Sequence, residues 1–84
     1  MKIQFISKDE FIDYAAYDCI EQSPEEDRSN IRNNPDPTFH HFGLGTFIRN
    51  EYIYDNEQIQ FEYESEDDLS REIIEAMISI LTQE

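Results

Sequence analysis

The chain has 84 residues and a formal net charge of −14, which results from twenty acidic and six basic side chains. This length allows one modest core, and a hydrophobic content of 38% excludes wholesale disorder, so we expect residues 1–84 to form a single small acidic domain. The negative charge repels nucleic-acid phosphates and anionic membranes, which argues against direct binding to either.

Two helices are predicted in the first part of the chain. Residues 1–6 alternate in polarity, which indicates a short strand or an extended lead-in. Ser7 begins a capping box and therefore predicts an amphipathic helix after it. Ser23 is followed by a proline and a glutamate, which predicts a second, short and polar helix that ends near Asn33.

A central helix is predicted from Asp36 to Asn50. Asp36 can cap a helix, and the proline that follows it is favoured at the first helical position. His41, Leu44 and Ile48 then recur at helical spacing. Other apolar residues surround this stripe, so we expect the central helix to be buried on several sides.

Two glycines lie inside this predicted helix. Gly43 and Gly45 would each destabilise a helix by about 1 kcal/mol relative to alanine. We interpret them as positions of close packing against another helix. The alternative is that the helix breaks there into a loop whose amides face a ligand, although the glycine pattern does not match a phosphate or dinucleotide fingerprint.

The polar residues of the central stretch have a structural and a functional interpretation. His41 shares the apolar face and is expected to be buried and hydrogen-bonded, whereas His40 is expected to be exposed. Neither histidine has a ligand partner one turn away, so no metal site is predicted. Arg49 is expected to pair with an internal carboxylate; alternatively it binds an anionic ligand. We interpret the motif as structural, with neither catalytic residues nor a cofactor: His41, Gly43, Gly45, Arg49 and Asn50.

The run from His41 to Asn50 resembles the central motif of a family of small bacterial domains of unknown function. In that family a histidine precedes G-L-G or L-G, and I-R-N follows. An acidic helix precedes the motif and an amphipathic helix follows it, as predicted for this chain. The resemblance ends after Asn50, where similar domains carry a tryptophan that this chain lacks. It implies a fold and provides no established activity.

After the central helix the pattern changes. Residues 52–63 are β-prone and leave open a short hairpin. Ser65, followed by three acidic residues, predicts the start of a final amphipathic helix. We therefore expect a mainly α fold, a compact bundle of about four helices. A hairpin after the central helix would make the fold α+β instead.

The acidic charge is concentrated in the second part of the chain. Residues 51–84 contain eleven acidic and one basic side chain, against nine and five in residues 1–50. We interpret this segment as a partner-binding surface in which aromatic anchors stand beside steering charges. The alternative is that these acids only maintain solubility and cap the last helix. The predicted partner-binding residues are Tyr52, Tyr54, Asp55, Glu57, Phe61, Glu62, Tyr63, Glu64, Asp67 and Asp68.

The single cysteine, Cys19, is consistent with a cytoplasmic protein and excludes an internal disulfide. No apolar run approaches the length of a membrane span, and the first residues lack the pattern of a signal peptide. We therefore expect a cytoplasmic protein that does not bind membranes.

A small, acidic, single-domain chain without cofactors is typical of immunity proteins, antitoxins and phage anti-defence inhibitors. We predict a non-enzymatic inhibitor or regulator that binds a protein with a basic surface, such as a nucleic-acid-binding cleft. One alternative is a small enzyme or ligand-binding domain that uses His40 or His41, Arg49 and Asn50. Another is a structural oligomerisation module. The sequence leaves the oligomeric state open.

Overall fold

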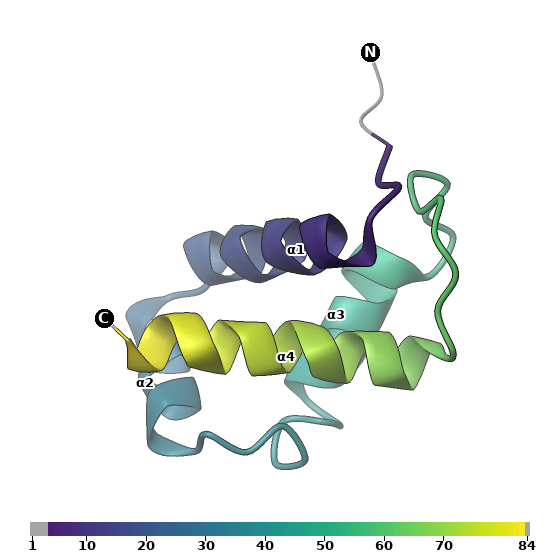
Figure 1. The fold of residues 1–84 in the computed structure, drawn as a ribbon. Helices are drawn as coiled ribbons and strands as arrows, with labels where there is room; N and C mark the ends of the chain where they lie inside the picture. Colours follow the sequence, from purple (N-terminus) through teal and green to yellow (C-terminus); the bar gives the residue numbers. More distant parts are fainter. Residues whose placement is uncertain (1–3, 84) are drawn as a thin grey trace.

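Helices α1 (Lys8–Gln22) and α4 (Glu66–Thr82) are the longest elements of the computed structural model, and they pack side by side (Figure 1). The structure describes residues 4–83. Each of the shorter elements also contacts α4, so α4 is the helix on which the others assemble. These elements are α2 (Glu25–Asn33), α3 (Leu44–Ile48) and the short π-helix η1 (Arg49–Ile53).

Local side chains determine where both long helices begin. The Ser7 hydroxyl accepts a hydrogen bond from a backbone N–H in the first turn of α1, and Ser65 does the same for α4. Both predicted helix starts are therefore confirmed. Ser23 does not cap the start of α2 as predicted. It ends α1, where its hydroxyl donates to the Cys19 carbonyl at 2.7 Å, and Pro24 occupies the N-terminal capping position of α2.

The core lies mainly between α1 and α4. Each of these helices buries one apolar stripe, as the spacing of its residues predicts. Burying one large side chain of this kind stabilises the fold by roughly 1.5–3 kcal/mol. Ile48 of α3 is also fully buried. The buried residues of α1 and α4 include Phe11, Ala15, Ala16, Cys19, Leu69, Ile73, Ile74, Met77 and Leu81.

The central segment is not the single helix predicted from Asp36 to Asn50. Residues 37–43 form successive turns, the α-helix begins only at Leu44, and the wider π-helix begins at Arg49. A π-turn contains more residues than an α-turn, so the side chains after Arg49 do not follow the register of a continuous helix. The prediction is therefore wrong at both ends of the segment.

Hydrogen bonds within the turns explain why the helix does not begin at Asp36. The Asp36 carboxylate accepts a hydrogen bond from the Thr38 N–H at 3.0 Å, which is an Asx-turn. The backbone then forms hydrogen bonds between residues three positions apart, such as the one from the His40 N–H to the Pro37 carbonyl at 3.1 Å. These bonds are typical of turns and 3₁₀ geometry, so the cap at Asp36 leads into turns and not into an α-helix.

The β-prone residues 52–63 do not form a hairpin. Within residues 4–83 the only β-pairing is an isolated parallel bridge, in which Phe5 exchanges backbone hydrogen bonds with Gln58 and Gln60. Asp55 has a left-handed backbone (φ 57°) and turns the chain after η1. The mainly α prediction is confirmed, and the α+β alternative is not observed. Of the strand expected at the N-terminus, residues 1–3 lie outside the described residues.

Candidate functional site

Arg49 of the central motif is buried and fully engaged inside the protein. One terminal nitrogen donates to the Ser70 hydroxyl at 3.0 Å, and the other donates to the His41 carbonyl at 3.3 Å and to the Thr46 hydroxyl at 3.1 Å. Its Nε lies 3.4 Å from the carboxylate of Asp67, the internal partner that was expected. The guanidinium therefore ties the central segment to α4 and is not directed at a ligand.

The two glycines of the motif have different surroundings. A Cβ added to Gly45 would lie 3.0 Å from a terminal nitrogen of Arg49 and 3.4 Å from the His40 carbonyl. A Cβ on Gly43 would have no neighbour within 4 Å. Close packing is thus required at Gly45, and the closest atom belongs to Arg49 of the same motif. The Ile74 side chain of α4 comes third, at 3.7 Å.

The predicted environments of the two histidines are wrong. His40 is buried and its Nε2 donates to the Asn34 carbonyl at 2.9 Å, whereas His41 is half-buried with its ring edge-on to Phe42. The assignment assumed helical geometry through both residues. Because they lie in the turns before Leu44, the rotation per residue of a helix does not apply to them.

The predicted aromatic anchors after the motif are mostly covered. Tyr52 is buried, and its hydroxyl donates to the Asp18 carboxylate at 2.6 Å. Burial and this hydrogen bond raise the pKa of Tyr52. Phe61 and Tyr63 are half-buried, so Tyr54 is the exposed aromatic residue of this group. The expectation of an exposed Tyr52 is therefore wrong.

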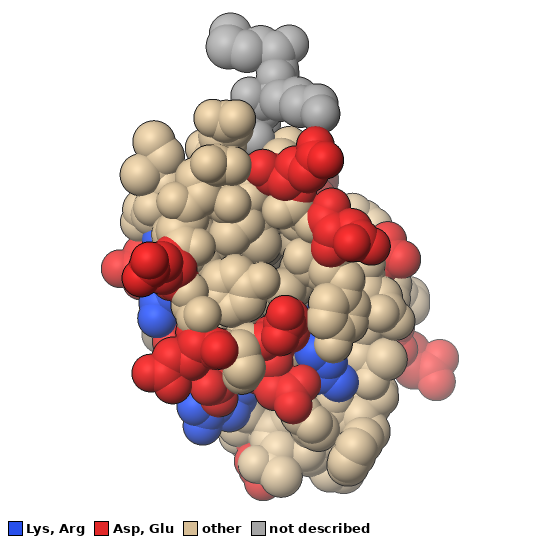
Figure 2. All heavy atoms as spheres, turned by 90° about the vertical axis from the view of Figure 1, so that its right-hand side faces the viewer, with Lys and Arg blue, Asp and Glu red and all other residues tan. Residues whose placement is uncertain are grey.

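The predicted acidic residues remain largely at the surface. Asp67 forms an ion pair with Arg49. Asp68 is half-buried, and its carboxylate lies 3.7 Å from the guanidinium of Arg71. Figure 2 shows that acidic side chains on this face, which includes the loop before α4, are separated by uncharged surface. The negative charge is therefore distributed in patches. The exposed acids of the predicted set are Asp55, Glu57, Glu62, Glu64 and Asp67.

Exposed aromatic residues occur where the sequence indicated burial. Phe39, Phe42 and Phe47 expose 60%, 85% and 45% of their surface. Tyr14 and Tyr17 of α1 are exposed as well. One signal of this was available, because a segment that is apolar on all sides cannot be covered completely in so short a chain.

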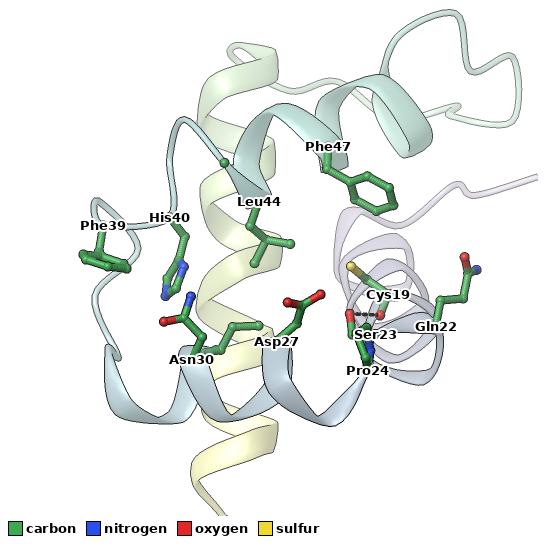
Figure 3. Close-up of a pocket in the computed structure, with 12 residues that line it drawn as sticks. Cys19, Gln22, Ser23, Pro24, Asp27, Asn30, Phe39, His40, Leu44 and Phe47 are labelled. Atoms are coloured by element: carbon green, nitrogen blue, oxygen red, sulfur yellow. Dashed lines mark hydrogen bonds between the residues drawn. The ribbon is translucent and has the colours of Figure 1, made fainter.

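An apolar hollow of about 530 Å³ lies beside Phe39 and Phe47 (Figure 3). Leu44 and Phe47 of α3 form one side of it, and Asp27 of α2 points its carboxylate towards them from the other. Phe39 and His40 line one end, and the end of α1 lines the opposite end. The lining also includes Cys19, Gln22, Ser23, Pro24, Asn30, Ile31 and Gly43.

The corner between α1 and α2 that lines the apolar hollow is held by hydrogen bonds. Arg28 of α2 donates to the Ile20 carbonyl at 3.0 Å, and the bond from Ser23 to Cys19 joins the same corner. Burial raises the pKa of the Cys19 thiol to about 11, so it is neutral at physiological pH and is not an activated nucleophile.

A second, acidic hollow of about 410 Å³ adjoins the first. Phe47 and Gln22 line both, so the two hollows are neighbours. Carboxylates at Asp18, Glu51 and Asp55 stand around the acidic hollow together with aromatic rings, a combination that suits a positively charged side chain. Its remaining lining residues are Tyr14, Tyr52, Tyr54, Asn56 and Gln58.

Other types of site find little support in the described part of the chain. Among residues 4–83, no group of three or more His, Cys, Asp and Glu side chains is arranged to hold a metal ion. None of the described helices combines the length and the apolar character needed to cross a bilayer. The apolar hollow contains His40, but neither Arg49 nor Asn50 lines it.

No family model, curated protein or solved structure matches this chain, so the family resemblance of the central motif stays a prediction.

Proposed function

We propose that this protein binds a partner protein with a basic surface and inhibits or regulates it, in the manner of immunity proteins, antitoxins and phage anti-defence inhibitors. The observation that supports this proposal is the exposure of aromatic rings beside carboxylates, on a chain with a net charge of −14. Exposed apolar groups of this kind are common at protein interfaces, and unlike charges accelerate association.

A ligand-binding domain is the second candidate, because the apolar hollow has the volume of a small-molecule site. The polar groups that would orient a ligand are already bonded within the protein, however. Arg49 is engaged by internal partners, and the Nε2 of His40 is bonded to the Asn34 carbonyl. We therefore favour a protein partner and a non-enzymatic role.

The proposal is tested with the full chain and a partner captured from cells of the source organism by crosslinking. Both proteins are then purified, and the rate of association is measured at about 50 and 500 mM salt, where screening differs strongly. We expect the rate to fall about tenfold or more at high salt. The partner should also lose activity when saturated with this protein. An association rate that does not depend on salt, or a partner whose activity is unchanged at saturation, would contradict the proposal.

A further inference from the structure

The linings of the two hollows share Phe47 and Gln22, so together they form one surface around these residues. We infer that this surface is a docking site for an extended basic segment of the partner, an inference that rests on the proposed function. An apolar side chain of that segment enters the apolar hollow, and a neighbouring lysine or arginine enters the acidic hollow. The site lies at the junction of α1, α2, α3 and η1, and not on the acidic loop before α4.

The apolar hollow supplies the contact area for an apolar side chain. Leu44 and Phe47 present carbon atoms on one side, and Phe39 keeps most of its surface in water at the end. Covering these groups removes apolar surface from water, which favours binding. The hydrogen-bonded corner between α1 and α2 holds the hollow open before a partner arrives, so little ordering is required on binding.

The acidic hollow supplies the charge preference. Glu51 and Asp55 are exposed carboxylates at its rim, and Asp18 is held in place by the hydroxyl of Tyr52 at 2.6 Å. The rings of Tyr14 and Tyr54 also line it. Carboxylates combined with aromatic rings favour an ammonium or guanidinium group through charge-assisted hydrogen bonds and cation–π contacts.

Charge complementarity identifies a basic segment as the occupant. A second copy of this chain would bring another net charge of −14 to a rim that is already acidic. Nucleic acids and anionic membranes are repelled for the same reason. A neutral small molecule would use the apolar hollow alone and would make no use of the negative charge of Glu51 and Asp55 at the rim of the second hollow.

Two pairs of variants separate this site from the general negative field. Phe47→Ala removes the ring shared by both hollows, and Phe42→Ala is its control, because Phe42 is exposed but lines neither hollow. Glu51→Gln with Asp55→Asn removes two charges from the rim. Asparagine is chosen for Asp55 because it tolerates the left-handed backbone. The charge-matched control is Glu62→Gln with Glu64→Gln, at two exposed positions outside the hollows.

The experiment uses a library of random peptides of about a dozen residues, displayed on phage and selected on the immobilised full chain. We expect enriched peptides to contain a lysine or arginine close to a leucine or an aromatic residue. The affinity of a synthetic copy of an enriched peptide should fall about tenfold or more for Phe47→Ala and for the rim variant, and less than about twofold for each control. Thermal unfolding verifies that every variant is folded. If Phe47→Ala unfolds because its ring packs against Tyr52, Phe39→Ala replaces it.

Several results would overturn the inference. These are no enrichment, enriched peptides without basic residues, or equal losses of affinity in the site variants and their controls. A dimer of the chain that Phe47→Ala dissociates would identify a second copy as the occupant and would also overturn it. The proposed function is judged separately with the captured partner. If that partner binds and is inhibited while Phe47→Ala leaves its affinity unchanged, the docking site is wrong and the function stands.

Discussion

Residues 39–47 and residues 52–63 are both rich in aromatic side chains, but they meet the solvent differently. The first segment exposes Phe39, Phe42 and Phe47, whereas the second buries Tyr52 and half-buries Phe61 and Tyr63. The second segment is also the more acidic of the two. Exposed acids therefore do not show that the aromatic residues between them are exposed, since a side chain can turn inwards while its neighbour remains in water.

The difference follows from what each segment packs against. Residues 52–63 run beside the beginning of α1, where the ring of Phe61 lies 5.6 Å from that of Phe11 and Phe5 pairs with the backbone around Ile59. Residues 39–43 are turns that connect α2 to α3 outside the contact between α1 and α4. Tyr52, Phe61 and Tyr63 of the second segment complete the core, and the aromatic rings of the first segment remain available for a partner.

The attachment of the central segment to α4 depends most strongly on Arg49. We expect Arg49→Met to lower the free energy of unfolding by about 3 kcal/mol, because several charge-assisted hydrogen bonds are lost while the Ser70 hydroxyl and the His41 carbonyl lose a donor. Urea denaturation measures the change. Arg71→Met is the control, because the ion pairs of Arg71 with Asp68 and Glu75 are long and lie at the surface. This substitution should lower the free energy of unfolding by less than about 1 kcal/mol. Similar losses for both variants would contradict the role of Arg49 as an anchor.

Gly45 tests the close packing behind the exposed phenylalanines. We expect Gly45→Leu to cost about 1–3 kcal/mol, because its side chain would displace the Arg49 guanidinium and press against the His40 carbonyl. Gly43→Leu is the matched control, since its Cβ would point into open space, and it should cost less than about 1 kcal/mol. An unchanged melting temperature for Gly45→Leu would remove the packing argument.

Tyr52 tests the burial of the second segment. We expect Tyr52→Phe to cost about 1 kcal/mol at neutral pH, because it removes the hydrogen bond to Asp18. Tyr54→Phe is the control and should have almost no effect, since Tyr54 is exposed. No difference between the two variants would show that Tyr52 is not held as described.

The same residue predicts a dependence on pH. Because burial raises the pKa of Tyr52 in the folded state, its contribution to stability is present below the ordinary tyrosine pKa of about 10 and is lost as the pH rises above it. The free energy of unfolding should therefore decline above about pH 10, and less steeply in Tyr52→Phe. Parallel declines in both proteins would contradict this assignment.

The smallest expected effect is a difference between the two histidines in their rate of chemical modification, which involves no change in the stability of the protein. Diethyl pyrocarbonate should modify His41 faster than His40, because His40 is buried and its Nε2 is bonded to the Asn34 carbonyl. Mass spectrometry of the partially modified protein gives both rates. Faster modification of His40 would show that the turns before α3 are arranged differently.

The sequence by itself determined the features that depend on neighbouring residues and on composition. The caps at Ser7 and Ser65 and the apolar stripes of α1 and α4 follow from contacts within one or two helical turns. The mainly α fold follows from these stripes, and the net charge follows from composition. The internal carboxylate partner of Arg49 was expected in kind, although only the fold identifies it as Asp67.

Only the tertiary structure decided which aromatic residues are covered. The π-helix at Arg49 and the inward position of Tyr52 depend on how the central segment packs against α4 and on the hydrogen bond from Tyr52 to Asp18 of α1. Contacts such as that between Tyr52 and Asp18, 34 positions apart in the chain, leave no trace in local spacing. The hollows beside Phe47 arise where α1, α2, α3 and η1 meet, so no single segment encodes them.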